Sequence, residues 1–474
     1  MSAEPTAQSA SLQKSIGPVQ FVAVGFGSIV GTGWVVLLGG WLLHAAPGGA
    51  ILGILLDGAA MALIAAMYAE LGSRFPRTGG EVTYIAAVFG KTCGFIVGWL
   101  LTLACLSALI FEGIALGWMF EVLWPPLAGP LLYMNFGEKI SLGGLLISLA
   151  GCATIAVLNY RGAHSFIRFQ NILTTLFLLI VFVIVGVELC FGSNGNLQPL
   201  WHPAGGGSWL IGIAWVFGNA PMMFNSFQSV LQAIEERTQA LSKEVVVRLC
   251  ILSVLLVMIF YLVIVVAAAR ATPWAVLAAS DLAAAEALAH LPWPRMLESV
   301  FLLALAASLL KSWNPVFMST VRLLFAQARE GMIPTCFGSV NPRTGAPDKG
   351  VIIVAVCNFI GIFLGKGALL PIVNAISISI ALIYVLTCTA ALVMRRRDPN
   401  HIGFRVPGGF AVGSLSVAAA LGMAVFALLQ PAPGGRADEF KWALLLSWVL
   451  LGLSLYLIRN RRTLPVPRAT AAPD

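Results

Sequence analysis

Long apolar stretches separated by short polar connections fill most of the chain. We count twelve apolar runs of about the length that crosses a bilayer, since a membrane helix needs about 20 residues. They lie near residues 17–44, 48–70, 93–122, 141–159, 169–191, 208–231, 244–270, 296–326, 350–364, 368–394, 409–430 and 439–458. The pattern predicts an all-α integral membrane protein with twelve transmembrane helices, joined by short loops without an inserted soluble domain. The segment 280–290 is alanine-rich and predicts a short surface helix between the seventh and eighth of these.

Composition and charge agree with this fold class. The 474 residues are 59% hydrophobic and only 10% charged, against about 25% charged residues in soluble domains. The net charge of +8 is not gathered into a basic patch interleaved with aromatic residues, so we expect the lipid bilayer and not nucleic acid as the partner. The eight cysteines form no CxxC pair and the histidines have no metal-ligand spacing. We therefore expect no metal and no cofactor.

The basic residues predict the orientation in the membrane. If the N-terminus is cytoplasmic, 21 of the 28 lysines and arginines lie on inner segments and six on outer ones, namely Lys139, Arg270, Arg295, Lys366, Arg436 and Lys441. Positive residues gather on the cytoplasmic side of membrane proteins. We therefore expect a multi-pass protein of a cell's inner (plasma) membrane, with both tails, 1–16 and 459–474, in the cytoplasm.

A glycine-rich stretch interrupts the first apolar run. Residues 27–34 read GSIVGTGW, and three glycines in seven residues each weaken a helix by roughly 1 kcal/mol relative to alanine. A break at membrane depth persists only where it is buried in protein or faces a wet cavity. The stretch therefore predicts a broken helix and a binding site. The alternative is a small-residue packing face on an unbroken helix.

The sixth run carries a second interruption, at Pro221 with Asn225 and Ser226 following it. Helices one and six are five apart, and because five is odd, a repeat of five helices would be inverted relative to its partner. This divides the chain into a first five-helix repeat at 17–191, a second inverted repeat at 208–394, and two extra helices at 409–458. Paired broken helices at matching positions of inverted repeats indicate a transporter's substrate site. The alternative at Pro221 is an ordinary kink.

Several motifs resemble the amino acid, polyamine and organocation (APC) superfamily of permeases. They are GSIVGTGW at 27–34, AELGSRFPRTGGEVTYIAAVFG at 69–90, PMMFNSFQSVLQAIEE at 221–236, KSWNPVFMSTVRLLFAQAREGMIP at 311–334 and NPRTGAP at 341–347. The resemblance extends over about residues 17–460 and implies the same fold of two inverted five-helix repeats. The acidic pair before helix seven is Glu235-Glu236, but the Asn-Pro that often follows it is replaced by Arg237-Thr238-Gln239.

The two breaks have opposite polarity. At the first, free N–H groups of Ile29 to Gly33 and the positive end of the outer half-helix suit a carboxylate. At the second, carbonyls released around 221–225 suit an ammonium group. The resemblance implies these roles for Val30, Gly31, Thr32 and Gly33, and for Met222, Met223, Phe224 and Asn225. Trp34, Phe224 and Phe227 are candidate gate or pocket-wall residues, although plain packing explains each of them singly.

Two ionisable residues lie deepest in the apolar runs. Asp57 and Lys311 both fall near the middle of their helices by helical rise. Burial disfavours a charged lysine, so Lys311 is a candidate for exchanging the coupling proton. In some sodium-coupled relatives an ion lies between helices one and eight, where an ammonium can replace it. The alternative is a permanently charged partner of Asp57 or of helix-end carbonyls.

The other acidic residues lie nearer the helix ends. Glu112, Glu121 and Glu188 fall toward the outer side, where we expect solvated interface carboxylates more than an entry path. Charged residues on the inner side form either a gate latch or simple positive-inside anchors. They are Glu70, Arg74, Arg77, Glu81, Glu235, Glu236, Arg322 and Arg329.

The sequence predicts a secondary active transporter of amino acids or related amines, working by alternating access and coupled to protons. An amino acid exchanger and a transporter-like nutrient sensor remain alternatives. The chain contains no P-loop and no GxSxG elbow, so we expect neither an ATP-driven pump nor an enzyme. The apolar lining of helices three, six and eight favours neutral substrates, whereas Asp57 and Glu112 favour cationic ones. Sequence alone does not set the oligomeric state.

Overall fold

The computed structural model describes residues 17–75, 80–161, 166–202, 208–232, 238, 241–339, 348–401, 403–430 and 435–458. Parts of the motifs named above lie outside these ranges. They are residues 76–79 of the RFPRTGGE stretch, the pair Glu235-Glu236 with Arg237, and the NPRTGAP segment at 341–347. Both predicted tails also lie outside the described residues.

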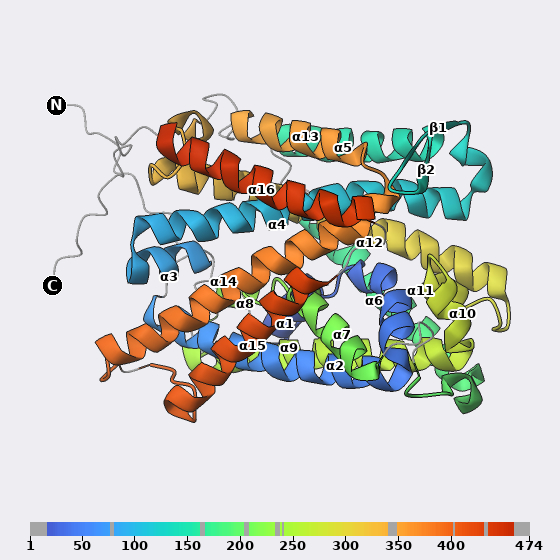
Figure 1. The fold of residues 1–474 in the computed structure, drawn as a ribbon, viewed down its shortest axis with the longest axis horizontal. Helices are drawn as coiled ribbons and strands as arrows, with labels where there is room; N and C mark the ends of the chain where they lie inside the picture. Colours follow the sequence, from blue (N-terminus) through green and yellow to red (C-terminus); the bar gives the residue numbers. More distant parts are fainter. Residues whose placement is uncertain are drawn as a thin grey trace.

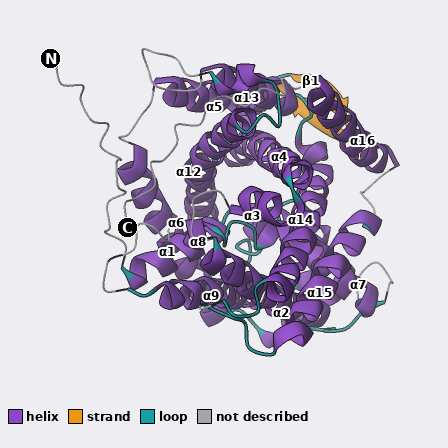
Figure 2. Ribbon diagram, turned by 90° about the vertical axis from the view of Figure 1, so that its left-hand side faces the viewer, coloured by secondary structure: helices purple, strands orange, loops and turns teal. Residues whose placement is uncertain are grey.

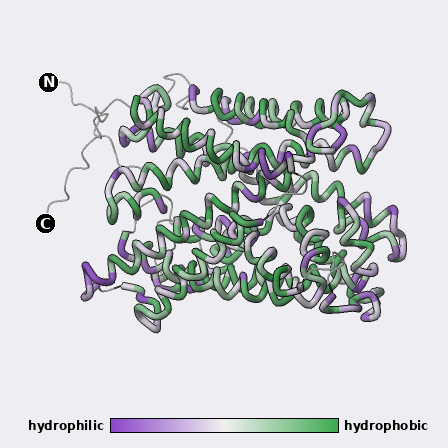
Figure 3. Tube along the Cα trace, viewed as in Figure 1, coloured by the Kyte–Doolittle hydropathy of each residue, from purple (hydrophilic) through white to green (hydrophobic). Residues whose placement is uncertain are grey.

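Within the described residues, nine helices are long and apolar enough to cross a membrane, by length and composition. They are α2 (Gly33–Arg74), α4 (Lys91–Leu123), α5 (Leu142–Arg161), α6 (Phe166–Phe191), α9 (Lys243–Ala271), α12 (Pro294–Arg329), α14 (Leu369–Arg397), α15 (Gly409–Leu429) and α16 (Gly435–Ile458). The chain is therefore a multi-pass, all-helical membrane protein. Hydrophobic residues cover the long helices, and hydrophilic residues gather toward the two ends of the bundle (Figure 3).

Shorter elements connect or extend these helices. The α-helices among them are α1 (Pro18–Ile29), α3 (Gly80–Phe89), α7 (Trp209–Met223), α8 (Ser229–Gln232), α10 (Trp274–Ala279), α11 (Ala283–Glu286) and α13 (Asp348–Ile362). The 3-10 turns among the described residues are η1 (Pro125–Ala128), η2 (Asn194–Leu197), η4 (Thr335–Gly338) and η5 (Lys366–Ala368). Strands β1 (Leu131–Asn135) and β2 (Glu138–Ser141) form an antiparallel hairpin, with Asn135 opposite Glu138.

The helices pack as two groups joined by α4 and α14. One group contains α2, α7, α9 and α15, and the other contains α5, α12 and α13 (Figures 1 and 2). Helix α4 packs against α12 and α14, while α2 packs against α7 and α9. Helix α16 lies at the periphery, with large apolar side chains such as Leu446 and Leu457 exposed. Such a face suits contact with lipid chains.

The first two predicted runs correspond to α1 and the long helix α2. At 42 residues and about 1.5 Å per residue, α2 exceeds the roughly 30 Å hydrocarbon core. Its backbone leaves helical geometry at Ala46, where φ is 55° and ψ is 172°. Pro47 follows and lacks an N–H donor. The Gly48 N–H donates to the Leu200 carbonyl at 2.9 Å, which holds this kink against the loop after η2. The kink falls in the gap between the predicted runs.

The prediction of a surface helix at 280–290 is wrong in one respect. A short helix is present, but Ala283, Ala284 and Ala285 are all buried. The segment packs on the N-terminal half of α2, where a Cβ on Gly39 would lie 3.2 Å from the carbonyl oxygens of Leu277 and Ser280. Alanine-rich composition reflects this close approach to another backbone, because only small side chains fit there.

Candidate functional site

The first helix breaks within the glycine motif. Helix α1 ends at Ile29, residues 30–32 are not helical, and α2 begins at Gly33. The Val30 N–H still donates to the Phe26 carbonyl at 2.9 Å, so it closes the first half-helix. In the described part of the chain, no acceptor contacts the N–H groups of Gly31, Thr32 or Gly33. Of the donors predicted from Ile29 to Gly33, the N–H groups of Gly31, Thr32 and Gly33 therefore remain. They lie at the positive end of α2.

The sixth predicted helix breaks as well. Helix α7 ends at Met223, residues 224–228 form a turn, and α8 begins at Ser229. Ser226 has φ of 76°, in the left-handed region that disfavours residues with a side chain. Such conformations cost roughly 1–3 kcal/mol and cluster at functional sites. The structure therefore maintains this break against local backbone preference.

Two of the released carbonyls are already bonded. The Met223 carbonyl accepts the Tyr261 hydroxyl at 3.0 Å, and the Met222 carbonyl accepts the Asn225 N–H at 3.4 Å. Across the described ranges, no donor contacts the carbonyl oxygens of Phe224 or Asn225. These two acceptors therefore remain for a cationic group.

The two breaks lie side by side. A Cβ added to Gly33 would lie 3.1 Å from Met222 Cε and 3.6 Å from Met223 Sδ. Three free donors at the start of α2 thus lie beside the turn that carries two free acceptors. This arrangement can bind a small molecule that carries a carboxylate and an ammonium group, because each break supplies the opposite partial charge.

Buried polar side chains at the first break also indicate a binding site. Thr32 and Trp34 are 6% and 3% exposed, yet Thr32 Oγ1 and Trp34 Nε1 have no hydrogen-bond partner among the described residues. A buried polar group left unpaired costs about 1–3 kcal/mol. A bound ligand or ordered water at the break would supply the missing partners.

The candidate wall residues are all buried. The Trp34 ring meets those of Phe260 and Phe301 at centroid distances of 6.4 and 6.1 Å. On the other side, Phe227 packs 5.0 Å from Tyr68 and 5.8 Å from Tyr384. Phe224 packs edge-on against Tyr261 at 5.6 Å. The breaks are thus enclosed by aromatic rings, and a gating role for Trp34, Phe224 and Phe227 stays a prediction.

Lys311 lies in the interior, but its acidic neighbour is not Asp57. Its side chain on α12 is 4% exposed, and Nζ lies 5.5 Å from the ring centroid of Phe177 on α6. The acidic group whose charge acts on it is Glu112 on α4, which makes no recorded ion pair with it in the described residues and accepts the Ser312 hydroxyl at 2.7 Å. The second carboxylate oxygen of Glu112 has no partner within the described residues. Lys311, Ser312 and Glu112 therefore form one buried polar cluster between α4 and α12.

The remaining deep acidic residues differ from the prediction. Asp57 is 3% exposed on α2, and its Oδ1 has no partner in the described ranges. Glu112 and Glu188 are 8% and 5% exposed, so the expectation of solvated interface carboxylates is wrong for both. The position of a residue along a helix does not indicate whether another helix packs on the face that carries its side chain. Glu121 is half-buried and accepts the Ser141 hydroxyl.

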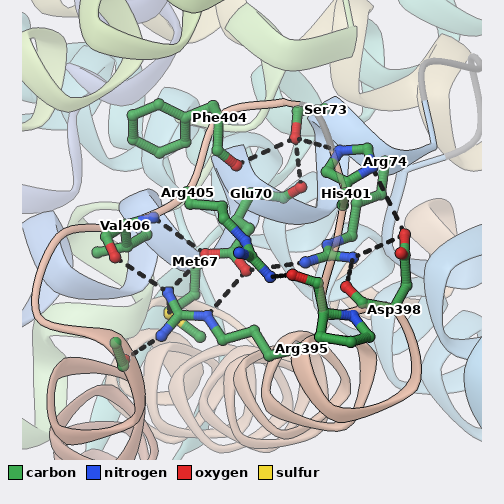
Figure 4. A network of polar contacts seen from close by, with 12 residues as sticks. Met67, Glu70, Ser73, Arg74, Arg395, Asp398, His401, Phe404, Arg405 and Val406 are labelled. Atoms are coloured by element: carbon green, nitrogen blue, oxygen red, sulfur yellow. Dashed lines mark hydrogen bonds and ion pairs between the residues drawn. The ribbon is translucent and has the colours of Figure 1, made fainter.

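A buried ion-pair network joins the C-terminal end of α2 to the C-terminal end of α14 (Figure 4). Glu70 is fully buried and accepts from Arg395 Nε at 2.8 Å and Nη2 at 2.5 Å, and from the Val406 N–H at 3.1 Å. Arg74 contacts Glu70 at 3.4 Å and Asp398 at 3.3 Å. A charge pair between two of the residues predicted for a latch, Glu70 and Arg74, is thus present, but the main cation of the network is Arg395, which was not among them.

Comparison with known proteins identifies the family of the chain. The model of the amino acid permease family matches residues 16–453. The chain belongs to the amino acid permease family. This permease therefore falls within the APC superfamily, as its motifs indicate, and membership in a family of transporters supports transport and not catalysis.

The permease is similar over most of its length to several transporters. The methylthioribose transporter of Bacillus subtilis (strain 168) is 24% identical, covering 96% of this chain and 95% of that protein. The branched-chain amino acid permease BcaP of the same organism is 26% identical, covering 95% and 94%. The Asc-type amino acid transporter 1 of Homo sapiens is 24% identical, covering 82% and 73%.

Sequence reasoning missed two residues that the structure places at these sites, Tyr261, which bonds the second break, and Arg395, which bonds Glu70. It named Glu112 but not its proximity to Lys311. Tyr261 lies in an unbroken apolar run, where no local pattern marks it as a contact of the second break. A cation partner for Glu70 could have been predicted, because a buried carboxylate one turn before a loop requires a positive charge beside it.

Proposed function

We propose that this permease is a secondary active transporter of amino acids or related amines that works by alternating access in a cell's inner membrane. The observation that carries the proposal is the adjacency of two breaks of opposite polarity, with Gly33 beside Met222. The N–H groups of Gly31, Thr32 and Gly33 bind the substrate carboxylate. The carbonyls of Phe224 and Asn225 bind its ammonium group.

The substrate side chain is neutral in this proposal. Aromatic rings from three helices, Trp34, Phe260 and Phe301, lie beside the first break. The methionines Met222 and Met223 lie beside Gly33 and add flexible apolar surface. The name of the B. subtilis relative BcaP, a branched-chain amino acid permease, supports an apolar side chain.

The driving force is a proton gradient, and Lys311 with Glu112 is the coupling cluster. When a lysine and a carboxylate are buried beside each other, the pair can gain or lose one proton without leaving a large uncompensated charge. Asp57, another buried carboxyl, is a further candidate. The cluster lies on α12 and α4, which pack against each other.

Uptake into proteoliposomes tests the function. The purified permease is supplied with a mixed pool of amino acids and amines, with and without an inward proton gradient, and the contents are read by mass spectrometry. Accumulation of neutral amino acids only with the gradient is the expected result. Uptake that requires only a counter-substrate would favour exchange. Binding without uptake under any gradient would favour a nutrient sensor.

Replacing Lys311 tests the coupling. We expect Lys311→Gln or Lys311→Ala to abolish gradient-driven uptake while sparing exchange of labelled substrate, because exchange requires no net proton movement. The matched control is Lys441→Gln, which removes another buried lysine, paired with Asp438 at 2.7 Å on α16. Unchanged pH dependence of uptake in the Lys311 variants would contradict the assignment.

A further inference from the structure

Glu81 is a buried carboxyl without a cation beside it. It lies in the first turn of α3, at the end of the RFPRTGGE motif, and is 3% exposed. None of the ion pairs among the described residues includes it. Glu81 was predicted either for a latch of paired charges or for an anchor, but in the described structure it is not part of a charge pair.

The titratable groups that face Glu81 are all neutral ones. Helix α3 packs against α4 and α14. The charge of Glu81 acts on Tyr68 of α2, Tyr84 of α3, Cys105 of α4 and Tyr384 of α14. Tyrosine and cysteine side chains offer hydrogen bonds but no positive charge at neutral pH.

The cations on the same elements are engaged elsewhere. Arg397 of α14 donates to a backbone carbonyl near the C-terminal end of α3 at 2.9 Å. Arg395 and Arg74 both contact Glu70, and Lys91 at the start of α4 is exposed. Burial without a cation raises the pKa of the Glu81 carboxyl. The side chain is therefore stable here as the neutral acid.

Helix α3 lies beside the segment that follows the second break. The Tyr68 ring packs 5.0 Å from Phe227, in the turn between α7 and α8. A Cβ on Gly72 of α2 would lie 3.6 Å from the Tyr84 hydroxyl and 3.8 Å from Leu231 Cδ1 on α8. Helices α3 and α8 therefore meet at one position of α2.

The position of α3 in the bundle suits a closing element. Seen from the end of the bundle where α2 and α14 finish, α3 lies across the middle of the ring of helices, with α4 and α14 beside it (Figure 2). The pattern of basic residues predicts that this end faces the cytoplasm. Any route from the second break to this end passes α3 and its buried acid.

We propose that Glu81 is a proton-binding residue, separate from the Lys311 cluster, that keeps α3 packed over this end of the bundle while it is neutral. The inference rests on the proposed function, in which a proton gradient drives transport and the two ends open alternately. When α3 moves away, water reaches the carboxyl. The O–H bond then breaks, the proton passes to water on the predicted inner side, and the carboxylate retains the electron pair. This carboxylate opposes the return of α3, because burying it without a cation is costly.

The reactivity of a cysteine covered by α3 tests the inference. The reporter is Leu231→Cys in a chain otherwise free of cysteine, since Leu231 is 4% exposed and shares its contact at Gly72 with Tyr84. N-ethylmaleimide labels it in proteoliposomes without substrate, from about pH 5 to about pH 8. Each rate is divided by that of a variant that retains only the exposed Cys336, which removes the ordinary pH dependence of a thiol. We expect the ratio to rise by up to about tenfold per pH unit, because the closed state binds one proton more than the open state.

Replacing the acid should remove this dependence. Glu81→Gln keeps the shape of the neutral acid and does not ionise, so we expect slow labelling of the reporter at every pH. The matched control is Glu330→Gln, which removes an exposed carboxylate after the end of α12, on the same predicted side. It should retain the slope of the parent reporter. Glu81→Met, which is neutral and of similar length, gives the same comparison if Glu81→Gln does not fold.

The outcomes separate this inference from the proposed function. A ratio that does not change with pH while Glu81 is intact overturns the inference, and so does a slope that Glu81→Gln leaves unchanged. Labelling requires no substrate, so neither outcome depends on uptake. A permease that takes up no amino acid or amine under any gradient overturns the proposed function, whatever the labelling shows.

Discussion

Gly33 lies beside Met222 of the second break, and the two breaks can approach each other here because glycine has no side chain. A Cβ there would lie within 3.1 Å of Met222 Cε, tighter than ordinary van der Waals contact. At Gly31, by contrast, a Cβ would meet nothing within 4 Å. Two glycines of one motif therefore serve different purposes: Gly31 frees the backbone, and Gly33 makes room for the second break.

A pair of substitutions tests this contact. We expect Gly33→Ala to weaken substrate affinity by about fivefold or more, since overpacking costs roughly 1–3 kcal/mol. Adding Met222→Ala removes the crowding Sδ and Cε atoms and should recover much of the loss. Uptake KM in proteoliposomes is the measurement, and Gly31→Ala, which meets no neighbour, should have a smaller effect. A Gly33→Ala defect that Met222→Ala leaves untouched would contradict the proposed packing.

At the scale of elements, buried charge connects α2 to α14. Glu70 lies four residues before the end of α2, and Arg395 lies two before the end of α14. Arg395 also donates to the carbonyls of Val406 and Gly409, at the end of the loop that leads into α15. His401 and Ser73 extend the network, with Nδ1 of His401 3.6 Å from Asp398 Oδ2. One carboxylate thus fixes two helix ends and a loop (Figure 4).

Removing one partner of this pair should destabilise the permease strongly. We expect Arg395→Ala to lower the free energy of unfolding by roughly 3–5 kcal/mol, because it leaves the Glu70 carboxylate buried without its main cation. The control is Arg396→Ala, one residue along, where the side chain is exposed and stacks on Phe410 at 5.4 Å. Thermal melting in detergent, followed by tryptophan fluorescence, provides the comparison. Equal melting temperatures for the two variants would show that the ion pair adds no stability.

At the scale of the whole molecule, the packing of two helix groups around α4 and α14 suits a protein in which one group moves against the other (Figure 2). The two breaks lie between α1 and α2 and between α7 and α8, whereas the Lys311 cluster lies between α4 and α12. The proposed coupling therefore requires that a change at one group of helices alters the other. Phe177 on α6, beside Lys311, and Phe260 on α9, beside Trp34, lie on helices that pack together.

Labelling of single cysteines tests the predicted orientation of the whole bundle. Cys336 is exposed on η4, on the predicted inner side, and Lys139 is exposed on the hairpin, on the predicted outer side. In a variant otherwise free of cysteine, we expect a membrane-impermeant maleimide to label Lys139→Cys in intact cells. Cys336 should react only after the membrane is opened. The reverse pattern would place both termini outside.

The pattern of residues was enough to predict a helical membrane protein and the positions of both helix breaks. Glycine density and an internal proline act through local backbone energetics, so their effect is readable without knowing any neighbour. Membrane character is similarly a sum over single residues. The motif resemblance then supplied the family, which the match over residues 16–453 confirms.

Which backbone groups at the breaks lack a partner, and which charged residues contact each other, follows from the packing of the helices in the folded protein. That the Met223 carbonyl is occupied depends on Tyr261, 38 positions further along the chain, and that Lys311 neighbours Glu112 depends on how α12 rotates against α4. The same holds for Glu70 with Arg395, which are 325 residues apart. In a chain that is almost uniformly apolar, periodicity does not distinguish a lipid-facing side from a buried one. Pairing between helices is therefore fixed by packing and not by local sequence.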